Sequence, residues 1–460
     1  MVQPAMAWPS QALGALVVLS LYWTSLSSAA GEVPLGVNYG TVADNLPPPS
    51  QVVSLIQSTI ITRIKLFGVD AAILNAFANS GIQVMVGVGN DQIKPLSDLA
   101  YAKQWVKDNV TPFMPATNIT YLSVGNEVLS SSDGEMIYDL QFAMQNLHDA
   151  CQEAGFSSVK ITSAHSMGLL QSSVPPSNGS FGAGPAAILR PIFSFLARTG
   201  SPYIANAYPF FGYLGKPNST NLQYALFNSS IPHYDNVTKL TYYNMFDAQI
   251  DAVYAAMARL GFKNVTVAVG ESGWPSAGDQ YAPGVGLENA KTFNTNLVKH
   301  LTSGKGTPLR PNATIETYIF ALFNENLKPG PTSEQNYGLF KPDMTPVYDC
   351  GIMKVTEGAA SGAKASMVRK EWCVAKAGAK AADVQAAMVW ACTQPGTDCS
   401  PTRSGQACSM PDTLVSHASY AMNAYFQSQG RHSWNCDFEG TAMVVYKDPS
   451  YGSCTYTYKG

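Results

Sequence analysis

The sequence contains few charged residues. Asp, Glu, Lys and Arg make up 13% of its 460 residues, about half the share found in an average soluble protein. The net charge is -3 and no long basic run occurs, so the chain lacks the electrostatic footprint of a protein that binds nucleic acid or an anionic membrane. Its 23 Tyr and 38 Gly favour instead a protein that handles neutral, hydroxyl-rich surfaces.

Several motifs of metal, serine and cofactor enzymes are also missing. The six histidines form no HExxH motif and no ligand cluster, and no CxxC pair is present, so no metal site is indicated. No serine stands in G-x-S-x-G, and Ser272 has no evident histidine partner. No apolar run leads into G-x-G-x-x-G; GVGN at 87–90 is at most a fragment of it. The sequence therefore implies neither a metal nor a cofactor.

Long apolar runs are rare, and the clearest one lies at the N-terminus. Residues 12–23 read ALGALVVLSLYW, followed by the small residues SLSSAAG at 25–31. This pattern predicts a secretory signal peptide over residues 1–30, cut near Ala30 or Gly31, with a buried helix as the alternative. The run is shorter than a membrane span requires. The closing YTYKG argues against a glycolipid anchor. We therefore expect a secreted protein, extracellular or in the cell wall, without a membrane anchor.

Potential glycosylation sites support the same expectation. Eight N-x-Ser/Thr sequons occur, and the one at Asn109 is a poor acceptor because Pro112 follows it directly. The seven predicted glycosylation sites are Asn118, Asn178, Asn218, Asn228, Asn236, Asn264 and Asn312. This density is typical of an extracellular surface.

Cysteines are unevenly distributed and divide the chain. Cys151 and Cys350 are isolated, whereas six cysteines fall within the last 88 residues, the pattern of a disulfide framework. Spacing does not decide how the six pair, nor whether the isolated two are free. Residues 351–369 are rich in Gly, Ala and Ser and predict a linker. We expect a catalytic domain over 31–350 and a disulfide-rich module over 370–460.

The large region alternates short apolar runs with segments long enough for helices. The runs are LGVNYG (35–40), RIKLFGV (63–69), QVMVGVGN (83–90), YLSVGNEV (121–128), KITSAH (160–165), YIANAYPFF (203–211), VTVAVGESGWP (265–275) and IETYIFALFNEN (315–326). Nearly continuous apolar strands joined by helices indicate a parallel sheet buried on both faces. Eight units in this length predict an α/β fold, a (β/α)8 TIM barrel. An open doubly wound sheet is the alternative.

Polar side chains gather where these runs end, the position at which barrel enzymes place their active sites. Glu127 ends the fourth run and Glu271 stands at the tip of the seventh. Tyr39, Tyr208 and Glu325 occupy similar places on the first, sixth and eighth runs. A lone glutamate at a strand end is usually a cap or an ion-pair partner, but two such glutamates indicate chemistry.

Two carboxylates facing each other across a cleft can hydrolyse a glycosidic bond. Runs four and seven lie on opposite sides of an eight-strand barrel, which suits the roughly 5 Å spacing of a retaining mechanism. Trp274 offers an aromatic face for a sugar, with core packing as the alternative. Glu316 begins its run, so it is expected low in the barrel with a structural role.

These motifs resemble the plant endo-1,3-β-glucanases of glycoside hydrolase family 17. The matching blocks, in order, are GVNYG (36–40), VGNEV (124–128), NAYPFF (206–211), VGESGWPSAG (269–278) and FALFNEN (320–326). The resemblance implies a (β/α)8 barrel and retaining hydrolysis. It also implies that Glu127 is the acid/base and Glu271 the nucleophile, and that Asn126 binds the sugar near its 2-hydroxyl. By the same resemblance Tyr39, Tyr208 and Phe211 line subsites, while Glu325 and Lys328 support the carboxylates.

The tail resembles the plant X8-type module, carbohydrate-binding module family 43. The matching segments are WCVAK (372–376), DCS (398–400), HASYAMNAYFQ (417–427), CDFEGTA (436–442) and CTY (454–456). The resemblance implies a small α+β fold with the pairs Cys373–Cys436, Cys392–Cys399 and Cys408–Cys454. SMPDTL (409–414) and Trp390 depart from the family pattern. Tyr420, Tyr425 and Phe426 are candidates for stacking on sugars, with packing between the disulfides as the alternative.

The two-domain order resembles the long pollen and cell-wall glucanases of plants, including the olive pollen allergen type. The predicted function is endo-hydrolysis of callose-like or laminarin-like 1,3-β-glucan with retention, on a polysaccharide partner held by the C-terminal module. A monomer is the default expectation. Two alternatives stay open: a 1,3;1,4-β-glucanase, and a wall protein that binds glucan without cutting it.

Overall fold

The computed structural model describes residues 34–217, 221–279, 282–354, 370–376, 378–431, 433–445 and 448–458. The expected signal peptide, Asn218 and residues 355–369 of the expected linker lie outside these described residues. Among the helices of the described residues, none is both long and apolar enough to cross a membrane.

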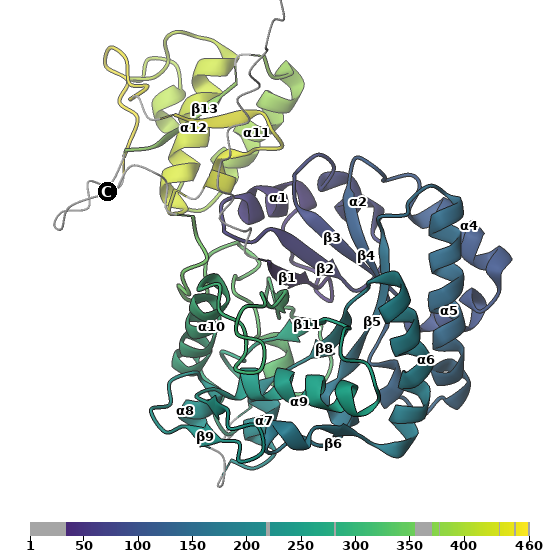
Figure 1. Cartoon of the computed structure of the whole chain (residues 1–460). Helices are drawn as coiled ribbons and strands as arrows, with labels where there is room; N and C mark the ends of the chain where they lie inside the picture. Colours follow the sequence, from purple (N-terminus) through teal and green to yellow (C-terminus); the bar gives the residue numbers. More distant parts are fainter. Residues whose placement is uncertain are drawn as a thin grey trace, which may run out of the picture. The chain divides into compact units, whose positions relative to one another are not determined.

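Eight parallel strands form a closed barrel in the order β1-β12-β11-β8-β5-β4-β3-β2 (Figure 1). They are β1 (Leu35–Tyr39), β2 (Arg63–Leu66), β3 (Gln83–Val88), β4 (Asn118–Asn126), β5 (Lys160–Ser166), β8 (Tyr203–Asn206), β11 (Val267–Ser272) and β12 (Thr317–Ile319). Each strand falls within or overlaps one of the eight apolar runs. The predicted (β/α)8 barrel is therefore confirmed, and the open-sheet alternative is wrong because β1 pairs with both β2 and β12.

Helices connect the strands and cover the outside of the barrel (Figure 1). They are α1 (Pro49–Gln57), α2 (Ala71–Ala76), α3 (Ile93–Leu96), α4 (Leu99–Asn109), α5 (Gly134–Glu153), α6 (Ala183–Thr199), α7 (Pro209–Leu214), α8 (Leu222–Ala225), α9 (Met245–Arg259) and α10 (Leu287–Thr302). Several of these helices have an N-cap side chain. Asp70, for example, accepts a hydrogen bond from the backbone amide of Ile73 at 3.0 Å at the start of α2.

Alternate strand residues enter two different cores, which explains the continuous apolar runs. In β3, Met85 belongs to a small cluster inside the barrel, together with Ile204 and Tyr318. Its neighbours Val84 and Val86 belong to the large core between strands and helices. Because both faces are covered, strand residues that point either way are mostly apolar, and a charged side chain inside the barrel requires a partner.

Two short hairpins, β6 (Leu170–Ser172) with β7 (Ser180–Phe181) and β9 (His233–Tyr234) with β10 (Thr241–Tyr242), extend the loops that follow β5 and β8. The sequence patterns did not predict them. Asp235 joins the two insertions, since its carboxylate accepts hydrogen bonds from the amide and the hydroxyl of Ser177 at 2.9 and 2.8 Å.

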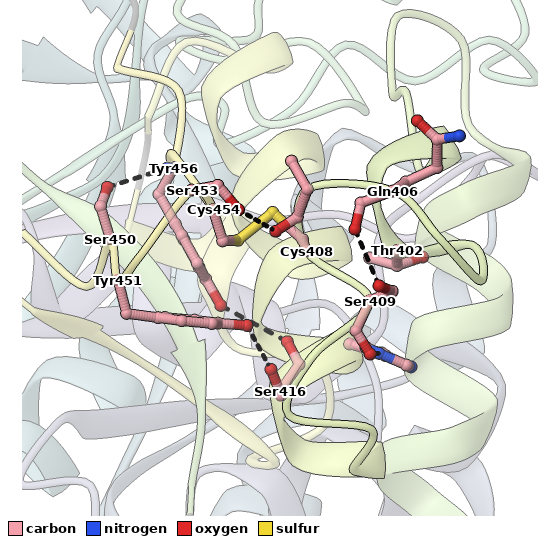
Figure 2. Close-up of a disulfide and its surroundings, with 12 residues drawn as sticks. Thr402, Gln406, Cys408, Ser409, Ser416, Ser450, Tyr451, Ser453, Cys454 and Tyr456 are labelled. Atoms are coloured by element: carbon pink, nitrogen blue, oxygen red, sulfur yellow. Dashed lines mark hydrogen bonds between the residues drawn. A yellow bond between two sulfur atoms is a disulfide. The ribbon is translucent and has the colours of Figure 1, made fainter.

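In the described residues of the C-terminal module, two strands and two α-helices are joined by three disulfides. Antiparallel β13 (Trp372–Ala375) and β14 (Ala442–Val445) pack with α11 (Ala381–Thr393) and α12 (Leu414–Ser428). The disulfides are Cys373–Cys436, Cys392–Cys399 and Cys408–Cys454, the same pairs that the X8 resemblance implies. In Figure 2 the Cys408–Cys454 bridge lies beside Tyr451, whose hydroxyl is 2.6 Å from that of Ser416.

Two of the three rings expected to stack on sugars are inside the module. Phe426 is 0% exposed and Tyr420 is 8% exposed, so they pack between the disulfides, as the alternative interpretation of these residues had it. Tyr425, in contrast, is partly exposed.

Candidate active site

Glu127 follows the last residue of β4 in an unusual backbone conformation. Its φ of 52° and ψ of 33° are left-handed, a region that costs a residue with a side chain free energy and that recurs at functional sites. Its amide donates a hydrogen bond to the carbonyl of Ala164 at 2.9 Å. One side-chain oxygen accepts a bond from Nδ2 of Asn206 at 2.9 Å. The neighbouring strands thus hold both the backbone and the carboxyl group of Glu127.

Glu271 is aimed into the barrel by an irregularity in β11. Strict alternation would place it on the outer face, with Val269. The pairing register shifts between Val269 and Glu271, however, and a bulge of this kind re-aims the side chains that follow it. The preceding Gly270 leaves room for its neighbours, because a Cβ there would lie 2.4 Å from a methyl group of Ile204.

Two polar side chains hold the carboxylate of Glu271. Nζ of Lys65 lies 2.7 Å from Oε1, and the hydroxyl of Tyr208 donates to Oε2 at 2.9 Å. All three side chains are largely buried. The ion pair and the hydrogen bond fix the position and direction of the Glu271 carboxylate.

Lys65 is a site residue that the sequence analysis missed. It lies in the middle of β2 and is 1% exposed, and its neighbours Ile64 and Leu66 face the outer core. A signal existed: a lysine inside an otherwise apolar strand of a doubly covered sheet is expensive to bury unless a carboxylate partner stands opposite.

Asn206, the second missed residue, lies at the end of β8 beside both glutamates. It pairs in register with Glu271 across β8 and β11, while its side chain donates to Glu127. It belongs to the NAYPFF block, but nothing in its spacing distinguished it from other polar residues at strand ends.

The electrostatic surroundings of the two glutamates differ. Burial raises the pKa of Glu127, the nearby charge of Glu271 raises it further, and the Asn206 hydrogen bond and Lys65 oppose this rise. Glu271 has the direct ion pair instead. The arrangement places a carboxyl group whose pKa is raised near one that is ion-paired with a lysine, and an acid and a nucleophile require such different surroundings.

Asn126, Tyr39 and Phe211 surround this centre in different ways. The backbone amide of Asn126 donates a hydrogen bond to Oδ1 of Asn90 at 2.8 Å. The side-chain Oδ1 of Asn126 lies 3.5 Å from Nζ of Lys65. Tyr39 is buried and packs edge-on against Phe323. Phe211 is 47% exposed and contacts the ring of Tyr208. Their roles toward a sugar stay predictions.

Trp274 does not offer a face to a sugar. It is 0% exposed, its indole N–H donates to the carbonyl of Gly284 at 2.8 Å, and Phe210 and Phe293 pack against it at 5.2 and 5.5 Å between ring centroids. The expectation of sugar contact is wrong for this residue, because the turn after β11 folds the ring back into the core.

The remaining candidate residues form contacts within loops or at the N-terminal end of the barrel strands. Glu325 is buried and accepts a hydrogen bond from the amide of Val42 at 2.8 Å. Lys328 pairs with Glu334 at 3.4 Å. Glu316 pairs with Arg63 at 3.1 Å at the N-terminal end of the strands, where a structural role was expected for it.

Among the residues that the structure describes, no three His, Cys, Asp or Glu side chains group closely enough to hold a metal ion. The polar groups around Glu271 are instead lysine, tyrosine and asparagine, which bind and orient hydroxyl-rich molecules through hydrogen bonds.

Comparison with known proteins places this site in a family. Residues 35–352 match the model of glycosyl hydrolases family 17, and residues 371–443 match that of the X8 domain. The family 17 match covers more than half of the chain, so the protein belongs to glycosyl hydrolases family 17.

Similar relatives include plant glucanases. The chain is 44% identical over 440 residues to glucan endo-1,3-beta-glucosidase 7 of Arabidopsis thaliana, covering 95% of this chain and 87% of the relative. It is 41% identical to glucan endo-1,3-beta-D-glucosidase of Olea europaea, covering 98% and 99%. Among solved structures, CJP38, a beta-1,3-glucanase and allergen of Cryptomeria japonica pollen, superposes with a TM-score of 0.66 and 46% identity, covering 68% of this chain and 98% of that one.

Proposed function

We propose that this protein is an endo-hydrolase of 1,3-β-glucan that works with retention of configuration. The observation that carries the proposal is the pair Glu127 and Glu271, with opposite electrostatic surroundings, at the ends of β4 and β11. Membership of family 17 and relatives named glucan endo-1,3-beta-glucosidase support the substrate.

In the proposed reaction Glu127 donates its proton to the glycosidic oxygen while a carboxylate oxygen of Glu271 attacks the anomeric carbon. The bond to the leaving sugar breaks and a glycosyl-enzyme ester forms. Glu127, now ionised, takes a proton from water as the water attacks the same carbon and releases Glu271. Lys65 and Tyr208 hold the carboxylate of Glu271 in position before the attack.

The proposal extends to the organisation of the whole chain. Residues 1–30 direct secretion to the extracellular space or the cell wall, 31–350 hydrolyse, 351–369 link and 370–460 hold the enzyme on its polymer, which raises the local substrate concentration. The seven predicted sequons are glycosylated, and the protein acts as a monomer.

The test is the release of reducing ends from a soluble 1,3-β-glucan by wild type, Glu271→Ala and Glu316→Gln. We expect Glu271→Ala to lose roughly a thousandfold or more, as removal of a covalent nucleophile does in other hydrolases. Glu316→Gln, which changes a carboxylate at the opposite end of the barrel, should keep activity within about tenfold. Equal activity in wild type and Glu271→Ala would mean that the nucleophile is misassigned.

The runner-up substrate is a mixed-linkage 1,3;1,4-β-glucan, since the same barrel chemistry would cut it. Product analysis on both polymers separates the two. Binding without hydrolysis by folded wild-type protein would support the non-catalytic alternative.

A further inference from the structure

Three aromatic rings meet at the surface of the C-terminal module. The ring centroid of Trp390, near the end of α11, lies 4.9 Å from that of Tyr425 and 6.0 Å from that of Phe438. Tyr425 and Phe438 are 5.6 Å apart. Trp390 is 46% exposed, whereas Phe438 is 8% exposed. The two inner rings thus support an indole that presents much of its surface to solvent.

The helix that carries Trp390 presents an apolar face to solvent. Of its thirteen residues, α11 buries Val384 and Ala391. The side chains on the opposite face, three or four residues apart, are exposed: Ala382, Ala386, Val389 and Thr393. No residue from 384 to 397 is charged. An exposed, uncharged apolar face of this kind marks an interaction site.

The third ring is held in place by a strained turn. Phe438 and Glu439 have φ values of 44° and 54°, the left-handed region that non-glycine residues usually avoid. The amide of Gly440 donates to the carbonyl of Asp437 at 2.9 Å, and the hydroxyl of Thr441 donates to the carbonyl of Phe438 at 2.7 Å. Backbone strain of this kind clusters at binding and catalytic sites.

We propose that Trp390, backed by Tyr425 and Phe438, is the surface on which the module stacks the sugar rings of a 1,3-β-glucan chain. A glucose ring has an apolar C–H face and a rim of hydroxyls but no charge, so it matches an exposed indole on a helix segment without charged residues. An anionic or a basic partner would find no countercharge along residues 384–397. The ligand class rests on the proposed function of the barrel.

Other aromatic side chains of the described module are less suited to this contact. Trp372 is 3% exposed and Tyr456 is 4% exposed, so their faces are already covered. Trp390 is 46% exposed, and an indole offers a larger apolar face than a phenol.

The experiment measures depletion of full-length protein by insoluble 1,3-β-glucan, with Glu271→Gln in every variant to prevent hydrolysis. Trp390→Ala should weaken binding about tenfold or more, equivalent to about 1.4 kcal/mol or more. Trp390→Tyr, which keeps a ring, should stay within about threefold of its parent. The matched control is Tyr138→Ala, which removes an aromatic side chain of α5 that is 57% exposed and also pairs with a ring, Phe142.

A second readout separates this inference from the proposed function. With Glu271 intact, Trp390→Ala should hydrolyse short soluble 1,3-β-oligosaccharides at the wild-type rate and insoluble glucan more slowly. Unchanged binding in Trp390→Ala, or equal loss in Tyr138→Ala, would overturn the inference and leave the function standing. If Trp390→Ala altered self-association and not glucan binding, the surface would be a protein interface. Absence of hydrolysis by the wild type would instead overturn the function.

Discussion

The barrel and the C-terminal module use cysteine in opposite ways. In the barrel, Cys151 and Cys350 are free thiols within the core, and burial is the main reason that the pKa of each rises to about 12. A thiol that rarely ionises is inert toward oxidation. In the module all six cysteines are joined in disulfides.

The contrast follows from the amount of apolar surface that each part buries. The barrel packs two layers of side chains, inside the strands and between strands and helices, and needs no covalent help. The module is near the size below which a core alone gives little stability. The disulfides supply the stability that the small core does not. The helix α11 can therefore bury only two residues and keep Trp390 and its apolar neighbours exposed for the proposed ligand.

The largest effect on the free energy of unfolding is expected from removing the disulfide that closes a long loop. Replacing Cys373 and Cys436 by Ala opens a loop of 63 residues and should cost the module about 4 kcal/mol. The pair Cys392 and Cys399, 7 residues apart, should cost about 2 kcal/mol. Calorimetry should show the module transition falling in that order with the barrel transition unchanged; equal shifts of both transitions would break the comparison.

A smaller effect is expected from a buried carboxyl group of the barrel. Burial raises the pKa of Asp251, in α9, to about 6, while hydrogen bonds such as those from Tyr242 and Leu309 oppose the rise. Because the folded pKa exceeds the unfolded one, its stabilising contribution is complete below about pH 4 and lost as pH rises through 6. The barrel should lose about 2 kcal/mol across this window.

Asp251→Asn should remove that part of the pH dependence, since the amide does not titrate and its oxygen can still accept hydrogen bonds. Chemical unfolding at pH 4 and pH 7 tests this. A wild-type barrel as stable at pH 7 as at pH 4, or an equally steep loss in the variant, would contradict the assignment.

Asn206→Ala should have the smallest effect on the free energy of unfolding, and it should also change the pH dependence of activity. Its hydrogen bond stabilises the ionised form of Glu127, so removing it should raise the pKa of Glu127. A general acid acts only while protonated, so the basic limb of the pH profile of kcat/KM should move to higher pH. The free energy of unfolding should fall by only about 1 kcal/mol.

The control for this prediction is Asn294→Ala, a buried asparagine of α10 that donates to the hydroxyl of Tyr348 at 2.7 Å. It should lower stability without moving the basic limb. A basic limb that stays in place in Asn206→Ala would mean that Asn206 orients Glu127 without affecting its proton.

Much of the fold was predictable because burial leaves a pattern in the chain. Strands covered on both faces require continuous apolar runs, and eight such runs predicted the eight barrel strands. The same logic brought Glu127 and Glu271 to one end of the barrel, since all parallel strands point the same way. Short hairpins such as β6–β7 have too few residues to leave such a pattern.

Side-chain direction could not be predicted, and the tertiary structure alone decided it. The sequence by itself determined the barrel, the division into a packed part and a stapled part, and the two glutamates at the strand ends. Only folding decided that Glu271 points inward, through the register shift in β11, that Lys65 reaches it from β2, and that Trp274 turns into the core. The physical reason is that a bulge or a turn re-aims side chains by local backbone geometry, and the partner that stabilises each direction lies far away in the sequence.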